Sequence, residues 1–233
     1  MKVAIFGEES KTIKPLVESY GLTVVEKDPE VVISYGGDGT FILSEYHFPG
    51  VPKLILKRSK NCKLCALFPN EEILKKIASG SYKINEVYKL EVSAKNKVGD
   101  KVGETMYAMA DAIVHNGDPR HCTRYTVEVK DFFSSQKEIV GDGLIIATPL
   151  GSTGYYRSIT DSIFNVGVGI AFNNSTEQAD HMIVKEDSEI NIKITRGPAF
   201  VYADNQPEFI SLNEGDAVHI KRSPQCARVV LVL

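Results

Sequence analysis

The sequence contains no long hydrophobic run, few cysteines and no excess of positive charge. No apolar run is long enough to cross a membrane, and the apolar residues at positions 1–7 are too few for a signal peptide. The four cysteines are too few for a disulfide scaffold in 233 residues, and they suit a reducing compartment. A net charge of −3 offers no global positive field for a nucleic acid or a membrane surface. We therefore expect a cytoplasmic protein with neither kind of partner.

Residues 1–80 alternate short apolar runs with helical periodicity. Apolar runs at 1–7, 22–25, 31–34 and 53–56 predict four strands. A helix is expected between the first two strands, with Thr12 as its N-cap so that Pro15, which lacks an N–H, falls in the first turn. A second helix is expected over 70–79, with Asn70 as N-cap and Gly80 beyond its end. The order of elements predicts an N-terminal α/β domain with a parallel sheet, residues 1–80.

The remaining residues, 81–233, predict a β-rich domain. Their apolar or alternating runs are separated by turn signals such as Gly99-Asp100 and Gly215-Asp216. The runs lie at 85–94, 104–115, 123–130, 144–147, 189–195, 199–203, 217–221 and 228–233. The sequence has no internal repeat, so a sandwich-like or closed sheet is the simplest way to bury both sets of apolar faces.

The first chemically informative stretch is the glycine-rich turn 35–40, which follows the apolar run 31–34. Gly36, Gly37 and Gly39 allow a ligand to approach the backbone closely, and the amides at a following helix start donate to anions. Asp38 is unusual there, because a carboxylate repels phosphate unless a metal intervenes or it takes a proton from an attacking hydroxyl. Taken alone, the pattern also suits a tight turn in which Asp38 only caps the helix.

A second glycine loop spans residues 141–155. Residues 144–147 predict a strand, and residues 151–154 then offer hydroxyls and close backbone approach at a helix start. Tyr155 is available to stack on a ring or to donate through its hydroxyl. These features equip the loop to hold a nucleotide, although a Gly/Ser loop that only caps a helix has the same composition.

Together, the two loops resemble those of the NAD kinases. Residues 36–40 match the GGDGT loop of that family, and residues 142–155 resemble its segment DGLIVSTPTGSTAY. Two such motifs in this order, about 100 residues apart, are far more specific than either alone. Residues 187–190 and 202–206 also resemble the family's late SSEI and DGQ-like segments. The family has an N-terminal α/β domain and a β-rich domain that holds NAD, in agreement with the organisation that the apolar runs predict.

The resemblance implies transfer of the γ-phosphoryl group of ATP, or of polyphosphate, to the 2′-hydroxyl of the adenosine ribose of NAD. It implies that Asp38 is the catalytic residue, which accepts the proton of that hydroxyl, and that Mg²⁺ carried by ATP offsets the charge repulsion. The implied phosphate-binding residues are Gly36, Gly37, Gly39 and Thr40. The implied NAD-binding residues are Asp111, Asp142, Thr153, Gly154 (where alanine is usual), Tyr155, Ser158 and Asp204. A homo-oligomer, dimer or tetramer, is implied as well.

This sequence departs from the family at further places, among them Leu150, where a polar residue is usual, and the missing GGP segment after the second loop. Two other departures bear on binding. Where the family has an Asn-Glu pair that grips NAD, this chain has Ala110 and Asp111, which removes an amide hydrogen bond worth about 0.5–1.5 kcal/mol net. The family's GINxGxLGFL segment is absent. In its place Lys57, Arg58 and Lys60 offer charges that suit phosphates, or that form a solvated basic turn.

Cys62 and Cys65 have C-x-x-C spacing. A zinc site needs two more ligands, and Cys122 and Cys226 are single and distant in sequence, so no metal site is assigned. A redox role stays open.

Two other functions stay open. A kinase of the broader group with a GGDG loop, acting on a lipid or sugar hydroxyl, would explain Asp38 but not residues 148–155. A regulator that binds NAD(P) without catalysis would explain Ala110 and the missing GINxG segment, but not the retention of Asp38.

Overall fold

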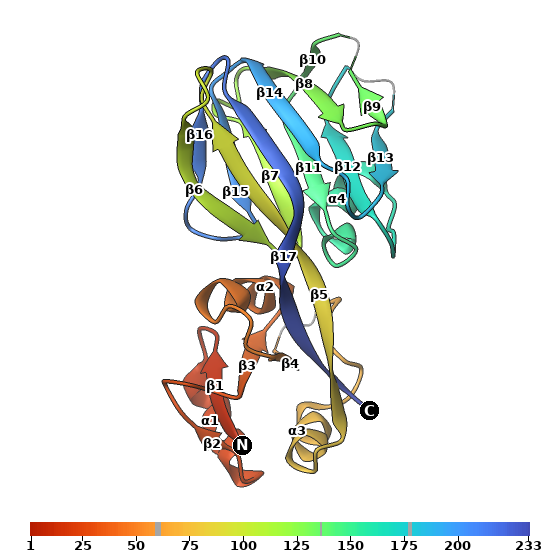
Figure 1. The fold of residues 1–233 in the computed structure, drawn as a ribbon. Helices are drawn as coiled ribbons and strands as arrows, with labels where there is room; N and C mark the ends of the chain where they lie inside the picture. The colour runs from red at the N-terminus through yellow and green to blue at the C-terminus, as the bar shows by residue number, and fades with distance from the viewer. Residues whose placement is uncertain (59–61, 136, 177–178) are drawn as a thin grey trace. The chain divides into compact units, whose positions relative to one another are not determined.

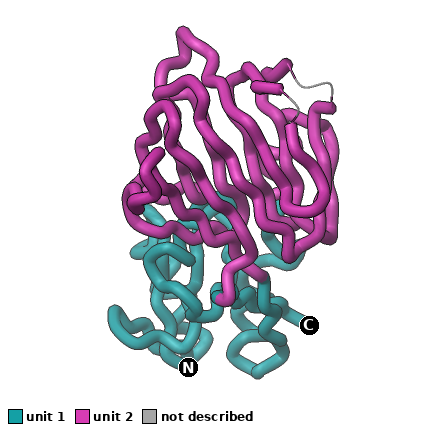
Figure 2. The backbone as a smooth tube through the Cα atoms, turned by 45° about the horizontal axis from the view of Figure 1, so that its top comes forward, with its two compact units in different colours: residues 1–87, 225–233 teal, residues 88–224 magenta. Residues whose placement is uncertain are grey.

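The computed structural model describes residues 1–58, 62–135, 137–176 and 179–233. The chain forms two compact units (Figure 1). The first unit contains residues 1–87 and 225–233, and the second contains residues 88–224 (Figure 2). The last residues of the chain therefore belong to the same unit as the first.

The described residues of the first unit form a parallel sheet and three helices. Its strands are β1 (Lys2–Phe6), β2 (Thr23–Val24), β3 (Val31–Gly36) and β4 (Lys53–Lys57), in the order β4-β3-β1-β2. Its helices are α1 (Ser10–Ser19), α2 (Asp38–His47) and α3 (Asn70–Ala78). Val229 of β17 adds a further parallel pairing with Lys53 of β4. The apolar stripes of α1 and α3 pack on the sheet, so that Val17, Leu74 and Ile33 share one core.

A buried ion pair fixes the end of α2. Lys53 at the start of β4 donates to the carboxylate of Glu45 on α2 and to the carbonyl of Phe48. The side chain of Lys53 is fully buried and that of Glu45 is 5% exposed. The same carboxylate accepts the amide of Gly50 at 3.0 Å, so several partners satisfy it.

In the second unit, the residues that the structure describes form two sheets. The first has the order β10 (Ile139–Gly141), β8 (Thr123–Val129), β14 (Ile190–Arg196) and β17 (Ala217–Val232), with β9 (Phe133–Ser134) on β8, β5 (Tyr82–Lys95) on β17 and β6 (Lys101–Ala108) on β5. The second has the order β13 (His181–Val184), β12 (Val168–Asn173), β11 (Gly143–Ala147), β7 (Asp111–Asn116), β15 (Ala199–Ala203) and β16 (Ile210–Leu212). Residues 82–87 of β5 and 225–232 of β17 belong to the first unit.

The two sheets of the second unit bury one common core. Val127 and Ile192 from the first sheet lie in the same cluster as Val114, Leu144 and Ile170 from the second. Alternating strands with inward apolar side chains produce such a sandwich. The predicted fold class, an α/β domain followed by a β-rich sandwich-like domain, is confirmed.

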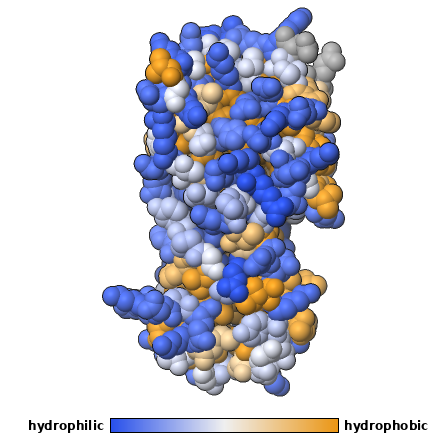
Figure 3. Space-filling model, viewed as in Figure 1, coloured by the Kyte–Doolittle hydropathy of each residue, from blue (hydrophilic) through white to orange (hydrophobic). Residues whose placement is uncertain are grey.

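The surface contrasts with these cores. The face of the molecule drawn in Figure 3 is largely hydrophilic, with separate orange apolar areas. No helix among the described residues combines the length and the apolar character that spanning a bilayer requires.

Several predicted ends of helices and strands differ from those in the structure. Helix α1 begins at Ser10 rather than after Thr12, so Pro15 lies inside it. Helix α3 takes Pro69 as its N-cap, which makes Asn70 its first residue. The run 104–115 is two strands, β6 and β7, because Met109 and Ala110 donate their amides to Asp204 instead of to a neighbouring strand.

Other differences concern whole strands. The runs 217–221 and 228–233 are one strand, β17, which also includes the residues between them. Strand β12 was missed, since Gly169 interrupts its short apolar run, although five of its six residues are buried. The short strands β9, β10, β13 and β16 were missed as well.

Candidate active site

The glycine-rich turn joins a buried strand to a helix in the first unit. Strand β3 ends at Gly36, Gly37 is the N-cap, and α2 begins at Asp38. A Cβ at Gly36 would lie 2.3 Å from the Oγ1 of Thr40, so only glycine fits there while Thr40 keeps its place. The segment therefore forms a strand, a glycine turn and a helix start, as its sequence predicts.

Gly7, which follows β1 and was not among the predicted site residues, completes this turn. Its φ of +138° is accessible to glycine. A Cβ at Gly7 would lie 2.3 Å from the carbonyl oxygen of Tyr35 and 3.4 Å from the Cγ2 of Thr40. The sequence signal was present: a glycine directly after the first parallel strand, where ligand sites of α/β sheets lie.

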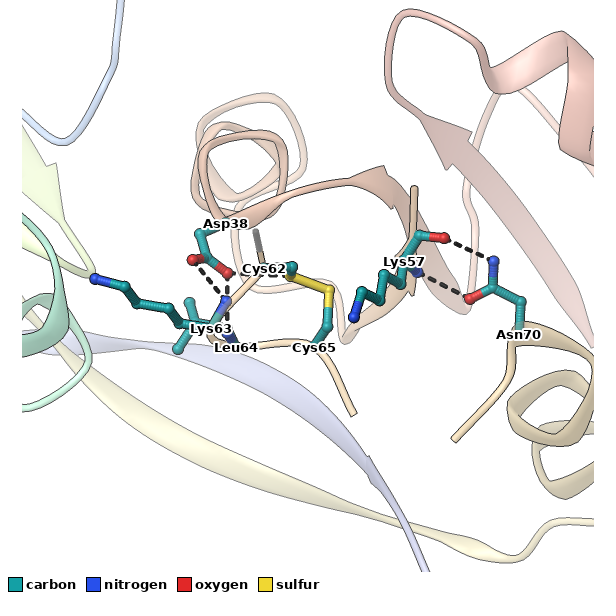
Figure 4. Close-up of a disulfide and its surroundings, with 7 residues drawn as sticks. All are labelled: Asp38, Lys57, Cys62, Lys63, Leu64, Cys65 and Asn70. Carbon is teal, nitrogen blue, oxygen red and sulfur yellow. Dashed lines mark hydrogen bonds between the residues drawn. A yellow bond between two sulfur atoms is a disulfide. The ribbon is translucent and has the colours of Figure 1, made fainter. Parts of the chain in front are cut away.

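The carboxylate of Asp38 meets a loop rather than its own helix. Its Oδ2 accepts the amide of Lys63 at 3.0 Å and its Oδ1 accepts the amide of Leu64 at 2.9 Å (Figure 4). The N-cap position belongs to Gly37, and no side chain caps the helix. The alternative in which Asp38 only caps the helix is therefore wrong.

The loop that meets Asp38 is closed by a disulfide between Cys62 and Cys65 (Figure 4). The Sγ of Cys62 lies 3.2 Å from the Oδ1 of Asp38. A sulfur in a disulfide carries no hydrogen, so this approach is a contact and not a hydrogen bond. The sequence left the role of these cysteines open, and it did not predict the disulfide.

The basic residues after β4 have partners of their own. The side chain of Asn70 accepts from the amide of Lys57 at 2.9 Å and donates to its carbonyl at 2.8 Å, which leaves the exposed side chain of Lys57 pointing elsewhere (Figure 4). The guanidinium of Arg58 forms an ion pair with Glu9. The amide of Arg58 donates to Gly36 at 3.1 Å, which brings this segment to the glycine turn. Lys60 lies outside the described residues.

In the second unit, Asp204 organises the segment between β6 and β7. Its carboxylate accepts three backbone amides, from Met109 at 2.9 Å, Ala110 at 2.8 Å and Asp111 at 3.0 Å. Asp204 itself adopts a φ of +52°, which aspartate tolerates better than most residues. Charge-assisted bonds of this kind hold a turn strongly.

Asp111 lies beside this carboxylate and is 9% exposed. Burial, and next the negative charge of Asp204, raise the pKa of Asp111 to about 7. A carboxyl group that exchanges a proton near neutral pH is typical of functional sites. A Cβ at Gly154 would lie 4.0 Å from the Oδ2 of Asp111, so the second glycine loop reaches the same place.

Tyr155 and Asp142 form the other part of this cluster. The hydroxyl of Tyr155 accepts from the amide of Asn173 at 3.1 Å. Asp142 accepts from Asn174 at 3.0 Å and from Asn116 at 3.4 Å. Burial, and next the charge of Asp142, raise the pKa of Tyr155. Asn116 was not among the predicted site residues, and its signal was its place at the end of a buried strand.

The second glycine loop is anchored to the same segment as Asp204. Its 3₁₀ turn η1 (Gly151–Thr153) leads into α4 (Tyr155–Thr160). The hydroxyl of Thr148 donates to the carbonyl of Met109 at 2.7 Å. A Cβ at Gly151 would lie 2.1 Å from the carbonyl oxygen of Ala110. This close packing places Gly154 next to Asp111.

Two groups of predicted residues are thus brought together, one in each unit. The first unit assembles Gly36, Gly37, Asp38, Gly39, Thr40 and the backbone of Arg58. The second assembles Asp111, Asp142, Thr153, Gly154, Tyr155 and Asp204. Ser158 differs from these, because it is exposed on α4 and its hydroxyl donates to the carbonyl of Tyr155 in its own helix at 2.7 Å.

The described residues contain no group of three or more His, Cys, Asp or Glu side chains arranged to hold a metal ion. The carboxylate of the glycine turn is that of Asp38, the first residue of α2.

Comparison with known proteins gives a consistent result. Residues 109–232 match the family model of the ATP-NAD kinase C-terminal domain. The chain is 28% identical over 239 residues to an NAD kinase of Acinetobacter baylyi, covering 94% of this chain and 74% of the relative. It is 30% identical over 186 residues to an NAD kinase of Sulfurisphaera tokodaii, covering 75% of this chain and 70% of the relative.

Solved structures share the fold. Yeast NADH kinase complexed with NADH aligns with a TM-score of 0.83 at 19% identity, covering 100% of this chain and 84% of that one. An NAD kinase from Archaeoglobus fulgidus in complex with ATP aligns with a TM-score of 0.76 at 19% identity, covering 98% of this chain and 93% of that one.

Proposed function

The chain belongs to the NAD kinase family, and we propose that Asp38 is the general base of its reaction. The chain is an NAD kinase, which transfers the γ-phosphoryl group of ATP to the 2′-hydroxyl of the adenosine ribose of NAD and so forms NADP. We assign the phosphate chemistry to residues of the first unit and the binding of NAD to residues of the second.

The position of Asp38 is the observation that supports the assignment. Asp38 is the first residue of α2, directly after a glycine turn whose close packing keeps side chains away from the backbone. Amides at a helix start favour an anion, so phosphate groups are held there while the carboxylate accepts the proton of the attacking hydroxyl. Gly36, Gly37, Gly39 and Thr40 hold the phosphates in this proposal.

Removal of that proton makes the 2′-oxygen a better nucleophile as it approaches phosphorus. The attacking and leaving oxygens lie roughly in line, so positioning and charge stabilisation supply most of the catalysis. The exposed Lys57 adds positive charge near the end of β4. Arg58 serves mainly through its backbone, because its guanidinium is paired with Glu9.

Mg²⁺ carried by ATP supplies neutralisation of the charge on the phosphates. Of the glycine turn, at most Asp38 would bind such a cation, because the described residues contain no group of three or more His, Cys, Asp or Glu side chains that could hold a metal ion. Polyphosphate is the alternative donor, since it offers the same charge and the same oxygen ligands.

The cluster in the second unit is our candidate for the NAD site. Asp111 and Asp142 accept hydrogen bonds from ribose hydroxyls, and Tyr155 stacks or donates through its hydroxyl. Asp204 holds the amides of residues 109–111 and so positions Asp111. Thr153, Gly154 and Ser158 line the same loop and helix.

The experiment incubates the purified full chain with NAD, ATP and Mg²⁺ and scores NADP with an NADP-specific dehydrogenase. We expect NADP that depends on both ATP and Mg²⁺, with polyphosphate as a separate donor arm. A chain that binds NAD but forms no NADP, or that phosphorylates a lipid or sugar instead, would contradict the proposal.

We also propose that the enzyme is a cytoplasmic homo-oligomer, a dimer or a tetramer, with no nucleic-acid or membrane partner. A net charge of −3 supports the absence of an electrostatic partner of that kind. Light scattering on the purified chain tests the assembly, and a monomeric mass at micromolar concentration would count against it.

A further inference from the structure

The C-x-x-C segment is a motif that the proposed phosphoryl transfer does not use. Its two cysteines are joined as a disulfide, and the two residues between them, Lys63 and Leu64, both donate their amides to Asp38. With the Sγ of Cys62 at 3.2 Å, three residues of the loop contact the same carboxylate (Figure 4). A covalent ring of four residues therefore lies directly on the proposed general base.

These contacts occupy the atoms that the reaction needs. A carboxylate accepts protons through the lone pairs of its two oxygens, and here each oxygen already accepts an amide. Hydrogen bonds to a charged acceptor are stronger than neutral ones, so a substrate hydroxyl must displace or share them. The disulfide limits the conformations of the loop and so keeps both amides in place.

We propose that Cys62 and Cys65 form a thiol–disulfide exchange site whose oxidation state sets the activity of Asp38. The disulfide form is the less active form, and the dithiol form is the working enzyme. The proposal rests on the assignment of Asp38 as the general base. The partner at the site is a low-molecular-weight or protein disulfide in one direction and a dithiol in the other.

The exchange is balanced. The thiolate of one cysteine attacks the partner disulfide, forms a mixed disulfide and releases one partner thiol. The second cysteine then attacks the mixed disulfide, which forms the bond between Cys62 and Cys65 and releases the second partner thiol. Two electrons pass from the cysteines to the partner, and their two protons end on the released thiols. A dithiol reverses both steps.

The loop is accessible to such a partner. Lys63 is exposed and both cysteines are half-buried, so small thiols reach the sulfur atoms from solvent. Leu67, two residues beyond the ring, is fully exposed. In the dithiol form the ring is open, and the amides of Lys63 and Leu64 yield to the substrate hydroxyl more readily.

The purified full chain is treated with oxidised glutathione to form the disulfide or with dithiothreitol to reduce it. The reagent is then removed, and kcat and the KM values for NAD and ATP are measured. Alkylation of thiols followed by mass spectrometry reports the state of Cys62 and Cys65 in each sample. We expect kcat to be about 10-fold lower in the disulfide form with little change in either KM, because a hindered base loses part of the roughly 10²- to 10⁴-fold that a general base supplies. Dithiothreitol should restore kcat.

Matched variants separate this pair from the other cysteines. Cys62→Ser/Cys65→Ser should give the same kcat after either treatment. Cys122→Ser and Cys226→Ser, which replace the free cysteines, should respond as the wild type does.

Three results would each overturn the proposal. The first is an equal kcat in samples shown to be in the disulfide and the dithiol form, and the second is a higher kcat in the disulfide form. The third is a cysteine pair that dithiothreitol does not reduce. Asp38→Asn distinguishes its failure from that of the base assignment. If Asp38→Asn is inactive but the kcat of the wild type is the same in the disulfide and the dithiol form, only the exchange proposal fails. If reduced Asp38→Asn keeps full activity, the base assignment fails first.

Discussion

At the scale of the residue, Asp38 and Asp204 make the same kind of interaction. Each carboxylate accepts hydrogen bonds from backbone amides of a segment distant in sequence. Amide donors hold a negative charge in a fixed place without a positive side chain. Asp111 lacks this environment, and its pKa is raised by burial and by the charge of Asp204. Asp111 therefore differs from Asp38 and Asp204 in its chemistry, although all three residues carry the same carboxyl group.

The raised pKa of Asp111 predicts a pH-dependent stability. In the folded protein its pKa is about 7, above the ordinary value of 3.8, so folding favours the protonated form. This contribution is complete below about pH 4 and is lost as the pH rises through about 7. Denaturation of the wild type and of Asp111→Asn across that range measures it. The wild type should lose free energy of unfolding relative to the variant, by at most about 1.4 kcal/mol per pH unit, whereas parallel curves would refute the prediction.

Two glycines of the second glycine loop, Gly151 and Gly154, should tolerate substitution by alanine to different degrees. A Cβ at Gly151 would lie 2.1 Å from the backbone carbonyl of Ala110, which cannot move without shifting the segment held by Asp204. A Cβ at Gly154 meets the carbonyl of Gly151 only at 3.3 Å. Gly151→Ala should reduce the free energy of unfolding by about 1–3 kcal/mol or more, and Gly154→Ala by less than about 1 kcal/mol. Thermal denaturation compares them, and equal losses would show that the contact is not limiting.

At the scale of the element, α2 is held at both ends. Its first residue bears the carboxylate that the Cys62–Cys65 loop contacts, and its last turns carry Glu45, which pairs with the buried Lys53 of β4. A buried charge left without its partner is costly, whereas exposed pairs contribute little. The buried pair therefore fixes the helix that presents Asp38.

Glu45→Ala should accordingly reduce the free energy of unfolding by about 3–5 kcal/mol. Its matched control is Glu18→Ala on α1, which breaks the exposed pair with Lys14 at 3.8 Å. That change should cost less than about 0.5 kcal/mol. Urea denaturation of both variants gives the comparison, and a loss below about 1 kcal/mol for Glu45→Ala would mean that α2 is held by other contacts.

At the scale of the whole molecule, the end of the chain returns to the first unit. Val229 pairs with Lys53, the amide of Leu233 donates to Ser81 at 3.1 Å, and Val230 is 5% exposed within the first core. The sequence predicted a single boundary near residue 80. The contacts instead divide the chain after residue 87 and again after residue 224, because one long strand, β17, takes part in both units.

This arrangement predicts different effects of two neighbouring residues. Val230→Ala should destabilise the first unit by about 1.5 kcal/mol, since it removes two buried carbons. Leu231→Ala, at a position that is 40% exposed, should cost less than about 0.5 kcal/mol. Equal values in chemical denaturation would indicate that the C-terminal segment does not contribute to that core.

Patterns in the sequence predicted the local structure but not the tertiary contacts. Both glycine loops, the strand before each and the order of α/β then β elements follow from patterns within a few residues, and the fold class and family were predicted from them. The contact of Asp38 with Leu64 spans 26 positions, and the pair of Arg58 with Glu9 spans 49. No local pattern encodes such pairings, so the loop on Asp38 and the neutralised Arg58 emerge only from the folded chain.

One measurement tests most directly whether this NAD kinase uses Asp38 as its general base. The kcat for NADP formation is compared between the fully reduced wild type and reduced Asp38→Asn, with circular dichroism to show that both are folded. We predict a loss of about 10²- to 10⁴-fold in kcat with little change in the KM for NAD. A folded variant that forms NADP at the rate of the wild type would contradict the account.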